Sequence, residues 1–372
     1  MRVAHVSDCF APRTGGIESQ VRALAGRQVA AGDEVRVITA TPGHGAVFAG
    51  TDIVDGIRLH RVAARVPFEL PVHPRTRREV GAVLDADPVD VVHVHAGVIS
   101  PFAWGAVRAA HDRGLPTLVT VHSVWGGLAR PAFGASDALA RWTDWGVTLS
   151  AVSDLAAARV AAGLPRSGEV LVLPNGIDPA DWVVEPVGVE GNRVRVATVM
   201  RLAPRKRTGP LLRMLDRARA GLAGRVELTA TLVGDGPARD RAERQARSSG
   251  LDDVVRFTGR LDRTGIRQVL ANSDVYVQPS IKESFGLAAL EARTAGLPVI
   301  ARAQSGSTQF INNGVEGLLA ADDAGMVAAL IRVATNRELL LAMTEHNRSV
   351  APMETWPHVL AAVSAAYTAA GA

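Results

Sequence analysis

Three observations predict an α/β protein built from two doubly wound, Rossmann-like parallel-sheet domains. The chain has 372 residues, 47% of them hydrophobic, which is enough to fill two sizeable cores. Short valine-rich runs alternate with helical segments, as in parallel sheets covered by helices on both faces. A stretch rich in proline, glycine and acidic residues, 182–192, interrupts this alternation, which then restarts. We therefore expect one domain at 1–184, a second at 185–353, and a final helix at 354–372.

In the first domain, a strand at 2–7 leads through a glycine-rich loop to an amphipathic helix from about 17 to 31. Helices are also expected at 101–113 and 153–163. The remaining strands are expected within the runs EVRVITA, VDVVHVHAG, PTLVTVHS, VTLSAVS and EVLVLPNG. Because these runs are apolar at nearly every position, they indicate strands that are buried on both faces.

The second domain repeats this architecture without repeating its sequence. Its strands are expected within RVRVATVMRL, RVELTATLVGDGP, VVRFTGR, DVYVQPS and LPVIARA. Two such domains would enclose a cleft, and open parallel sheets bind their ligands at the carboxyl ends of the strands. Candidate functional residues are therefore sought in the loops that follow strands.

The composition excludes several classes of protein. Cys9 is the single cysteine, which excludes a disulfide framework and a cysteine-based metal cluster and fits a reducing cytoplasm. The formal net charge of +4 is small and the basic residues are scattered, which argues against nucleic-acid binding. No apolar run is long enough to cross a bilayer, and the first residues read as a strand rather than a signal peptide. We expect a cytoplasmic protein.

The two lysines of this chain lie at notable positions. Lys206 and Lys282 are the only lysines among 41 basic residues. Codon bias explains the arginines but not these two positions, although chance could. Lysine offers a compact point charge that arginine does not duplicate.

Two loops could bind an anion. Gly15 and Gly16 follow the first strand and precede a helix, so backbone amides could face a ligand there, although a plain turn is the alternative. Arg201 ends the strand that opens the second domain, and Lys206 lies five residues on. At a strand end these two cations could neutralise a diphosphate without a metal, whereas a solvated basic loop is the alternative.

The segment PSIKESFGLAALE suggests a third loop with a function. Glu283 stands before an expected helix, Ser284 is a plausible N-cap, and the amides that would then lack partners are those of Phe285, Gly286 and Leu287. Glu291 lies eight residues after Glu283, roughly 12 Å along a helix axis, so the two acids cannot share one reacting bond. They could instead bind hydroxyl groups at both ends of one elongated ligand. The alternative is that Glu291 pairs with Arg293 or Arg302.

Four further motifs have weaker readings. His122 follows a strand and could donate to a substrate hydroxyl, or it could be structural. His93 and His95 point to one face of a strand, but no third or fourth ligand with suitable spacing is apparent, so we expect no metal. LVGDGPARD begins like a dinucleotide fingerprint, but Arg239 stands where the third glycine should be. LPNGID, residues 173–178, is a hinge or a turn.

Together these motifs resemble one family. The segments GGIE, TVHS, PNGID, RLAPRKR, LVGDGP, FTGR and ESFGLAALEARTAGLPVIA are similar to those of the retaining glycosyltransferases of family 4, which have the GT-B fold and include the phosphatidylinositol mannosyltransferases. The resemblance spans nearly the whole chain. The two spaced glutamates combined with the upstream arginine and lysine are its most specific part.

The resemblance implies a function and roles for the candidate residues. It implies transfer of a hexosyl group from GDP-mannose or a UDP-hexose to a small-molecule, glycan or lipid-linked hydroxyl, with retention and without a metal or other cofactor. The donor would bind mostly to the C-terminal domain, and the last helix would cross back to the N-terminal domain. The implied contacts are the diphosphate for Arg201 and Lys206, the sugar hydroxyls for Glu283, the ribose for Glu291, the phosphates for Gly16 and the sugar near its reacting carbon for His122.

The sequence also departs from the family pattern. In SGSTQFINNGVEGLL, Gln309 stands where an acid is expected and Asn313 replaces an aspartate, while Gly306, Gly314 and Gly317 are kept. This departure puts details of donor binding in doubt but not the fold. It also leaves open a protein that binds a nucleotide sugar without catalysis.

Other questions stay open at this point. Arg75, Arg77 and Arg78 begin an N-terminal-domain helix that could touch an anionic membrane at its inner face, or could simply be solvated. Trp125, Trp142 and Trp145 could line an acceptor groove or fill the core. A sugar-nucleotide epimerase and a nicotinamide-dependent oxidoreductase are further alternatives.

Overall fold

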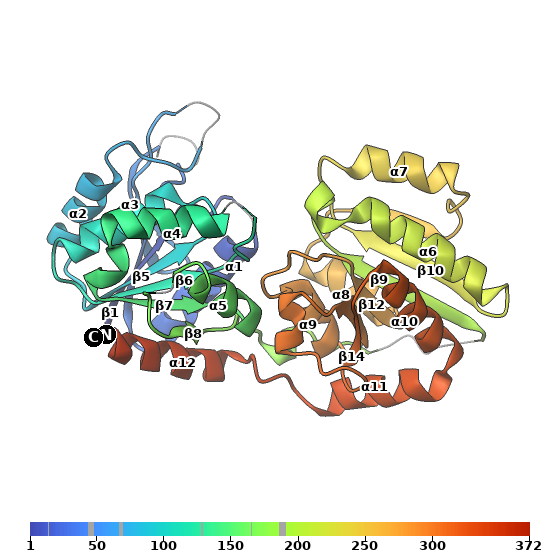
Figure 1. The fold of residues 1–372 in the computed structure, drawn as a ribbon. Helices are drawn as coiled ribbons and strands as arrows, with labels where there is room; N and C mark the ends of the chain where they lie inside the picture. The colour runs from blue at the N-terminus through green and yellow to red at the C-terminus, as the bar shows by residue number, and fades with distance from the viewer. Residues whose placement is uncertain (14, 44–47, 67–69, 128, 165, 186–190) are drawn as a thin grey trace. The chain divides into compact units, whose positions relative to one another are not determined.

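A computed structural model describes the chain except residues 14, 44–47, 67–69, 128, 165 and 186–190. The fold consists of two compact units, and each is described by itself (Figure 1). The N-terminal unit comprises Met1–Gly176 together with Trp356–Ala372, and the C-terminal unit comprises Ile177–Thr355. The expected linker at 182–192 lies partly outside the described residues.

The N-terminal unit is built on one eight-stranded sheet in the order β3-β4-β2-β1-β5-β6-β7-β8. The strands are β1 Arg2–Ser7, β2 Glu34–Thr39, β3 Gly50–Val54, β4 Ile57–Arg61, β5 Val91–Ala96, β6 Thr117–Val121, β7 Val147–Ala151 and β8 Val170–Val172. The helices are α1 Gly16–Ala30, α2 Thr76–Ala86, α3 Pro101–His111, α4 Ala129–Ala140, α5 Asp154–Ala161 and α12 Trp356–Ala369. All pairings between these strands are parallel except β3 with β4. The expected strands and helices are therefore present, with ends that differ by a few residues.

The β3–β4 hairpin is an addition that the sequence analysis did not anticipate. Asp55 and Gly56 connect the two strands with φ angles of 52° and 77°. Two consecutive residues with positive φ are typical of a type I′ hairpin turn, and Asp-Gly is among the preferred pairs for it. The dipeptide was therefore a local signal for this hairpin.

The C-terminal unit contains a six-stranded, all-parallel sheet in the order β11-β10-β9-β12-β13-β14. The strands are β9 Arg193–Val199, β10 Glu227–Val233, β11 Val255–Gly259, β12 Val275–Gln278, β13 Val299–Arg302 and β14 Gly317–Ala320. The helices are α6 Thr208–Leu222, α7 Arg239–Ser248, α8 Arg263–Ala271, α9 Leu287–Thr294, α10 Asp323–Thr335 and α11 Arg337–Ser349. In chain order this is 3-2-1-4-5-6, the order of the Rossmann fold. The prediction of two Rossmann-like domains is confirmed.

Side-chain caps explain why several helices begin where they do. Asp262 accepts from the Gly265 amide at the start of α8, and Asp322 accepts from the Gly325 amide at the start of α10. Ser153 does the same for the Ala156 amide of α5. Each cap satisfies one amide that the first turn of a helix leaves without an intrahelical acceptor.

The final helix, α12, completes the core of the N-terminal unit, as predicted. Its buried residues Trp356, Val359 and Tyr367 pack with Val3 and Leu24 on one face of the sheet. Gly176 allows this approach, because a Cβ atom there would lie 2.5 Å from the Trp356 ring. Gln20 holds Gly176 through two hydrogen bonds, at 3.1 and 3.3 Å, so PNGID is an anchored segment at the end of the unit.

The first and last residues of the C-terminal unit lie next to each other. The Ile177 amide donates to the Glu354 carbonyl at 2.8 Å, and Ile177 forms a parallel bridge with Thr355. The two chain passages between the units therefore lie side by side. Among the described residues, no helix combines the length and the hydrophobicity that a bilayer crossing requires.

The tryptophans contribute to packing. Trp125 is fully buried and stacks on Phe133 with ring centroids 3.9 Å apart, and Trp142 is also buried. Trp145 is half-buried against His111 and Arg108. Of the two readings of these residues, core filling fits Trp125 and Trp142.

Candidate active site

The candidate site of the C-terminal unit lies where the strand order reverses. Strands β9 and β12 are neighbours there, and the helices that follow them connect in opposite directions across the sheet. Ligands of open α/β sheets bind at this point, outside the carboxyl ends of the strands. The loop after β9 carries Lys206 and the loop after β12 carries Glu283.

Lys206 and Glu283 form an ion pair. The Lys206 Nζ atom donates to Glu283 Oε2 at 2.6 Å, and both side chains are mostly buried, with exposed fractions of 21% and 12%. Gln278 adds a longer hydrogen bond to the same oxygen, at 3.4 Å. The structure thus brings together two residues 77 positions apart that the sequence analysis had singled out separately.

Backbone contacts fix the loop that carries Lys206. The Leu202 amide donates to the Asp235 carbonyl at 2.9 Å, and the Ala238 amide donates to the Leu202 carbonyl at 2.9 Å. Gly234 and Gly236 have φ angles of +128° and +152°, and Cβ atoms there would lie 1.9 and 2.5 Å from the carbonyl oxygens of Met200 and Leu202. These glycines therefore serve close packing of two loops, which accounts for LVGDGP without a dinucleotide.

Arg201 lies at the end of the β9 segment and is exposed. Within the described part of the chain it makes no hydrogen bond or ion pair. Its guanidinium is therefore available to an anionic ligand, unlike Arg207, which pairs with Asp323 at 2.6 Å.

The start of helix α9 differs from the prediction. We expected Ser284 to be the N-cap, but α9 begins at Leu287 and its N-cap is Gly286, in the left-handed region with φ 98°. A glycine adopts this conformation without steric cost, so the chain turns there rather than at Ser284. The amides of Leu287 and Ala288, not those of Phe285 and Gly286, are the first two of the helix and lack intrahelical acceptors. Phe285 is instead buried.

Glu291 lies within α9 and has no ion-pair partner among the described residues. The alternative pairings are wrong, because Arg293 pairs with Glu316 at 3.4 Å and Arg302 pairs with Asp323 at 2.9 Å. Burial raises the pKa of the Glu291 carboxyl to about 8, with only a distant Arg263 opposing this shift. The expected helical spacing of the two glutamates is also wrong, because Glu283 lies in the loop before α9.

The segment that departs from the family pattern supports the Glu283 loop. The Gly306 amide donates to the Glu283 carbonyl at 2.7 Å, and a Cβ atom at Gly306 would lie 2.1 Å from the Ser284 carbonyl oxygen. A Cβ at Gly317 would lie 2.0 Å from the Val299 carbonyl oxygen, and Gly314 has φ +89°. The retained glycines thus allow close backbone packing and a left-handed turn. Gln309 and Asn313 differ from the family pattern in their side chains.

In the N-terminal unit, Gly15 and Gly16 begin helix α1 and both are exposed. A Cβ atom at Gly15 would lie 2.4 Å from Glu18 Oε2, so this glycine makes room for a carboxylate of its own helix. A Cβ at Gly16 would meet nothing within 4 Å. The space beside Gly16 is therefore open.

Asp8 is a buried residue of this unit that the sequence analysis did not identify. Its Oδ1 atom accepts from the Phe102 and Ala103 amides, at 3.1 and 3.3 Å, in the first turn of α3. Burial raises the pKa of this carboxyl to about 6 despite these hydrogen bonds. The α3 N-terminus is thus occupied by an acid of the protein itself.

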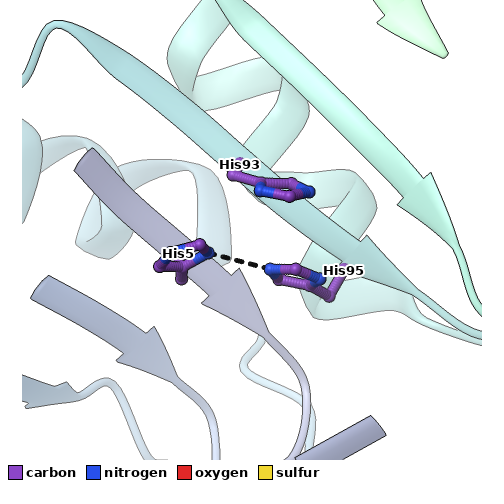
Figure 2. Close-up of side chains that lie close together, drawn as sticks. All are labelled: His5, His93 and His95. Carbon is purple, nitrogen blue, oxygen red and sulfur yellow. Dashed lines mark hydrogen bonds between the residues drawn. The ribbon is translucent and has the colours of Figure 1, made fainter. Parts of the chain in front are cut away.

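His122 follows β6 and belongs to a cluster of four histidines. We expected no third potential ligand to accompany His93 and His95, but His5 on β1 pairs in register with His93 on β5 (Figure 2). One nitrogen from each of these three rings lies within 4.8 Å of the others. The signal was available in sequence, because His5 is central in the first strand, which neighbours β5 in a doubly wound sheet.

The arginines at the start of α2 are partly neutralised. Arg77 pairs with Asp112 at 2.5 Å, and Arg113, which lies beside them, pairs with Asp85 at 2.6 Å. Among the described residues, the one carboxylate that pairs with Arg78 is that of Glu79, at 3.9 Å. A surface cavity of about 580 Å³ is lined by this group of residues, including Arg75.

The fold and its charged loops define a class: two Rossmann-like domains arranged along the chain as in GT-B enzymes. Two family models match, "Glycosyltransferase Family 4" over residues 14–181 and "Glycosyl transferases group 1" over residues 185–350. Sucrose-phosphate synthase from Thermosynechococcus elongatus has a similar fold, with a TM-score of 0.76, 19% identity and coverage of 99% of this chain and 98% of that one. The structure of Anabaena HepE in complex with UDP and glucose is also similar, with a TM-score of 0.72 and 18% identity, and the match covers 98% of this chain and 97% of that one.

Curated relatives agree with the family models. The GDP-mannose-dependent alpha-mannosyltransferase of Mycolicibacterium smegmatis is 30% identical, covering 86% of this chain and 84% of the relative. The phosphatidyl-myo-inositol mannosyltransferase of Mycobacterium leprae is 29% identical, and the match covers 90% of this chain and 88% of the relative. The glycogen synthase of Mycobacterium tuberculosis H37Rv is 29% identical, covering 89% and 85%. The chain belongs to glycosyltransferase family 4 and is a glycosyltransferase of the predicted hexosyltransferase class.

Proposed function

We propose that this enzyme transfers a hexosyl group from GDP-mannose or a UDP-hexose to an acceptor hydroxyl, with retention and without a metal ion. The observation that carries this proposal is the Lys206–Glu283 ion pair at the switch point of the C-terminal sheet. It places a fixed cation and a carboxylate beside the unpaired first amides of α9. A diphosphate flanked by hydroxyl-bearing groups is the ligand that matches this combination.

Each group has a proposed role in binding the donor. Lys206 and the exposed Arg201 neutralise the diphosphate, supplying the charge that a metal ion supplies in other enzymes. The α9 amides and the helix dipole add to this field. Glu283 accepts hydrogen bonds from hydroxyls of the transferred sugar.

Glu291 is proposed to bind the ribose. A half-buried carboxyl without a partner is costly, and two vicinal hydroxyls would supply the missing hydrogen bonds. The raised pKa of Glu291, about 8, is the expected property of such a group before the ligand arrives. Ribose binding would then favour the ionised carboxylate and lower this pKa.

Gly15, Gly16 and His122 are proposed to contact the donor from the N-terminal unit. The open space beside Gly16 suits a phosphate group, and His122 would contact the sugar near its reacting carbon. In the transfer step, the acceptor oxygen bonds to the anomeric carbon as the bond to the leaving phosphate breaks. The acceptor proton passes to that phosphate on the same face, which retains the configuration.

The names of the relatives and neighbours support both donor choices. One relative is named for GDP-mannose and one structural neighbour was solved with UDP and glucose. Another relative is named for phosphatidyl-myo-inositol, which supports a lipid-linked acceptor among the candidates. Neither name selects the base or the acceptor for this chain.

Donor screening tests the proposal. The protein is incubated with UDP-glucose, UDP-GlcNAc and GDP-mannose, with and without EDTA, and free nucleotide release is measured. We expect slow hydrolysis of one donor, unaffected by EDTA, and a raised Tm with that donor. The absence of both effects with all three donors would contradict the proposal. Binding without turnover across a broad acceptor screen would favour a non-catalytic binding protein instead, and a changed sugar without any acceptor would identify an epimerase.

We further propose peripheral contact with the inner face of an anionic membrane through the start of α2. Arg75 and Arg78 are exposed there and lack a close carboxylate partner among the described residues. Flotation with vesicles that contain phosphatidylinositol tests this, with phosphatidylcholine vesicles as the comparison. Equal flotation of the protein and of its Arg75→Ala/Arg78→Ala variant would contradict it.

A further inference from the structure

A continuous chain of hydrogen bonds leads from helix α1 to His122 through the sheet of the N-terminal unit. Gln28 Oε1 lies 2.6 Å from His5 Nε2, and His5 Nδ1 lies 2.9 Å from His95 Nε2. His95 Nδ1 in turn lies 3.0 Å from His122 Nε2. Figure 2 shows the His5–His95 link and the neighbouring His93, whose ring is tilted by 31° from that of His95. Gln28, His5 and His95 are at most 3% exposed.

A second branch starts from the same glutamine. The Gln28 side-chain amide donates to the Tyr367 hydroxyl at 3.1 Å, and this hydroxyl lies 2.9 Å from His93 Nδ1. His93 Nε2 lies 2.7 Å from Thr120 Oγ1, which lies 2.7 Å from Ser150 Oγ. The branch therefore joins α12, β5, β6 and β7, all within one unit.

All four imidazoles are neutral at pH 7. Burial lowers the pKa of His5 and of His122 to about 4. Burial lowers the pKa values of His93 and His95 well below the usual value, and the neighbouring histidines lower them further. No carboxylate hydrogen-bonds to any of the four rings in the described residues, and for His5 the effect of burial outweighs the opposing effects of Gln28 and Asp33.

Neutrality couples the tautomers of these rings. A neutral imidazole has one N–H donor and one bare nitrogen, so each ring in a chain must donate at one end and accept at the other. If His5 carries its proton on Nε2, its Nδ1 accepts from His95 Nε2, and His95 Nδ1 then accepts from His122 Nε2. Reversing one ring leaves two donors or two bare nitrogens facing each other in a buried place, which is unfavourable.

Gln28 sets the direction in both branches. Its carbonyl oxygen faces His5 and can only accept, so His5 carries its proton on Nε2. Its NH₂ group faces Tyr367 and can only donate, so the tyrosine hydroxyl donates to His93 Nδ1 and His93 donates from Nε2 to Thr120. The two branches thus require the same tautomer in every ring.

We propose that the amide of Gln28 acts through this network as a positioning residue that fixes His122 as the Nε2–H tautomer. The Nδ1 atom of His122 is then a bare acceptor. It is suited to a hydroxyl group that donates, and not to an anionic oxygen. The tautomer itself does not depend on the proposed function. Only the last step, that this acceptor meets a hydroxyl of the donor sugar, rests on it.

The same cluster could instead hold a metal ion, since His5, His93 and His95 offer three nitrogens within 4.8 Å. A metal would need a bare nitrogen from each ring, directed at one point. Both nitrogens of each of these three rings already face hydrogen-bond partners. The hydrogen-bonded network therefore accounts for the cluster, and metal binding becomes an outcome of the test.

Nitrogen NMR of the full chain, labelled with ¹⁵N-histidine and treated with EDTA, tests the tautomers directly. Long-range ¹H–¹⁵N spectra at pH 7.5 distinguish Nε2–H from Nδ1–H rings, and single His→Gln variants assign the signals. We expect Nε2–H for His5, His93, His95 and His122. Opposite tautomers in neighbouring rings, or Nδ1–H in all four, would overturn the proposal. Loss of the His5, His93 and His95 signals on addition of Zn²⁺ alone would also overturn it.

Two variants separate positioning from general damage. In Gln28→Met the side chain keeps its size but not its polarity, so His122 should populate both tautomers. Thr120→Val is the matched control, because Thr120 hydrogen-bonds His93 and Ser150 but no ring of the branch that leads to His122, so the His122 signal should stay in the Nε2–H form. A His122 signal that stays Nε2–H in Gln28→Met would overturn the role of Gln28. If that variant does not fold, the wild-type spectrum still decides whether the four rings share the Nε2–H tautomer that the network requires.

A kinetic comparison tests the last step on its own. Once a donor is identified, Gln28→Met should lower kcat about three- to tenfold with little change in donor KM. Altered tautomers with unchanged kcat would refute the sugar contact alone, whereas failure of every donor would refute the proposed function and leave the tautomer result standing.

Discussion

The two units place a helix N-terminus at the same topological position but treat it differently. In the N-terminal unit, α3 follows the strand next to β1, and the buried Asp8 accepts from two of its first amides. In the C-terminal unit, α9 follows the strand next to β9, and no described group accepts from its first two amides. The polar groups near it are instead a mostly buried ion pair, Lys206 with Glu283.

The difference teaches that the fold alone does not make a binding site. Both sheets have a switch point. Among the described residues, the one in the C-terminal unit leaves helix amides without acceptors and an arginine, Arg201, without an ion-pair partner. At the switch point of the N-terminal unit, by contrast, two helix amides are satisfied by a carboxyl group of the unit itself, that of Asp8. If the donor binds mostly to the C-terminal unit, as proposed, substitutions in the two units should differ in their effects on activity and on stability.

Removing the cation of the C-terminal unit should have the largest effect. If Lys206 neutralises the leaving diphosphate, Lys206→Ala should lose about 2–4 kcal/mol of transition-state stabilisation, seen as a large fall in kcat/KM. Steady-state assays with the identified donor measure this. Lys282→Ala is the matched control, because Lys282 is the other lysine of the chain and is exposed. Near-normal turnover of Lys206→Ala would remove the main contrast between the units.

Filling the space beside Gly16 should have the next largest effect. A Cβ atom there meets no protein atom, so Gly16→Ala should leave Tm unchanged. If donor phosphates approach this backbone, kcat/KM should fall about tenfold, or ~1.4 kcal/mol. Gly234→Ala is the opposite control: its Cβ would lie 1.9 Å from the Met200 carbonyl oxygen, so it should destabilise the fold itself. Full activity of Gly16→Ala would exclude the N-terminal loop from phosphate binding.

Uncapping α3 should affect stability but not the donor. Asp8→Ala removes the acceptor for two amides and should lower the free energy of unfolding by about 0.5–2 kcal/mol. Asp8→Asn keeps an acceptor and should lose less. Urea unfolding followed by circular dichroism measures both variants, and donor affinity should be unchanged. A marked loss of donor affinity in Asp8→Ala would mean that the N-terminal switch point also serves the donor.

Glu291 should give the free protein a pH-dependent stability. Its pKa rises from 4.5 to about 8 on folding, so the folded state binds more protons between these values and stability falls as pH rises through this window. Glu291→Gln should remove this dependence, with a gain in Tm that is larger at pH 8 than at pH 5. Glu345→Gln, at an exposed position, is the control. Parallel Tm-versus-pH curves for wild type and Glu291→Gln would show that folding does not raise the pKa of this carboxyl.

Much of the fold was predictable because its strands are apolar runs of the right length. The parallel strands β1, β2 and β5 are buried along nearly their whole length, and the sequence marks them clearly. The β3–β4 hairpin escaped because β3 is a polar edge strand, and only its Asp-Gly turn signalled it. The return of α12 to the first unit was implied by the family resemblance and could not be read from periodicity.

The site was predictable in its residues but less so in its contacts. The rarity of lysine pointed to Lys206, and its position beside a strand end linked it to Glu283. The helix start at Leu287 was misplaced, because a serine is a common N-cap and Gly286 in a left-handed conformation overrides it. The network of Gln28, His5 and Tyr367 depends on residues far apart in sequence, so pairwise spacing could not reveal it.

The packing of α12 has a consequence for how the molecule is made. The C-terminal unit is continuous in sequence, 177–355, whereas the N-terminal unit needs residues 356–372 to complete one of its two hydrophobic clusters. On the ribosome, the N-terminal part of this unit therefore waits until residues 356–372 emerge. We expect the nascent first unit to expose the apolar groove that α12 later covers, and to be the part of the chain that chaperones protect during synthesis.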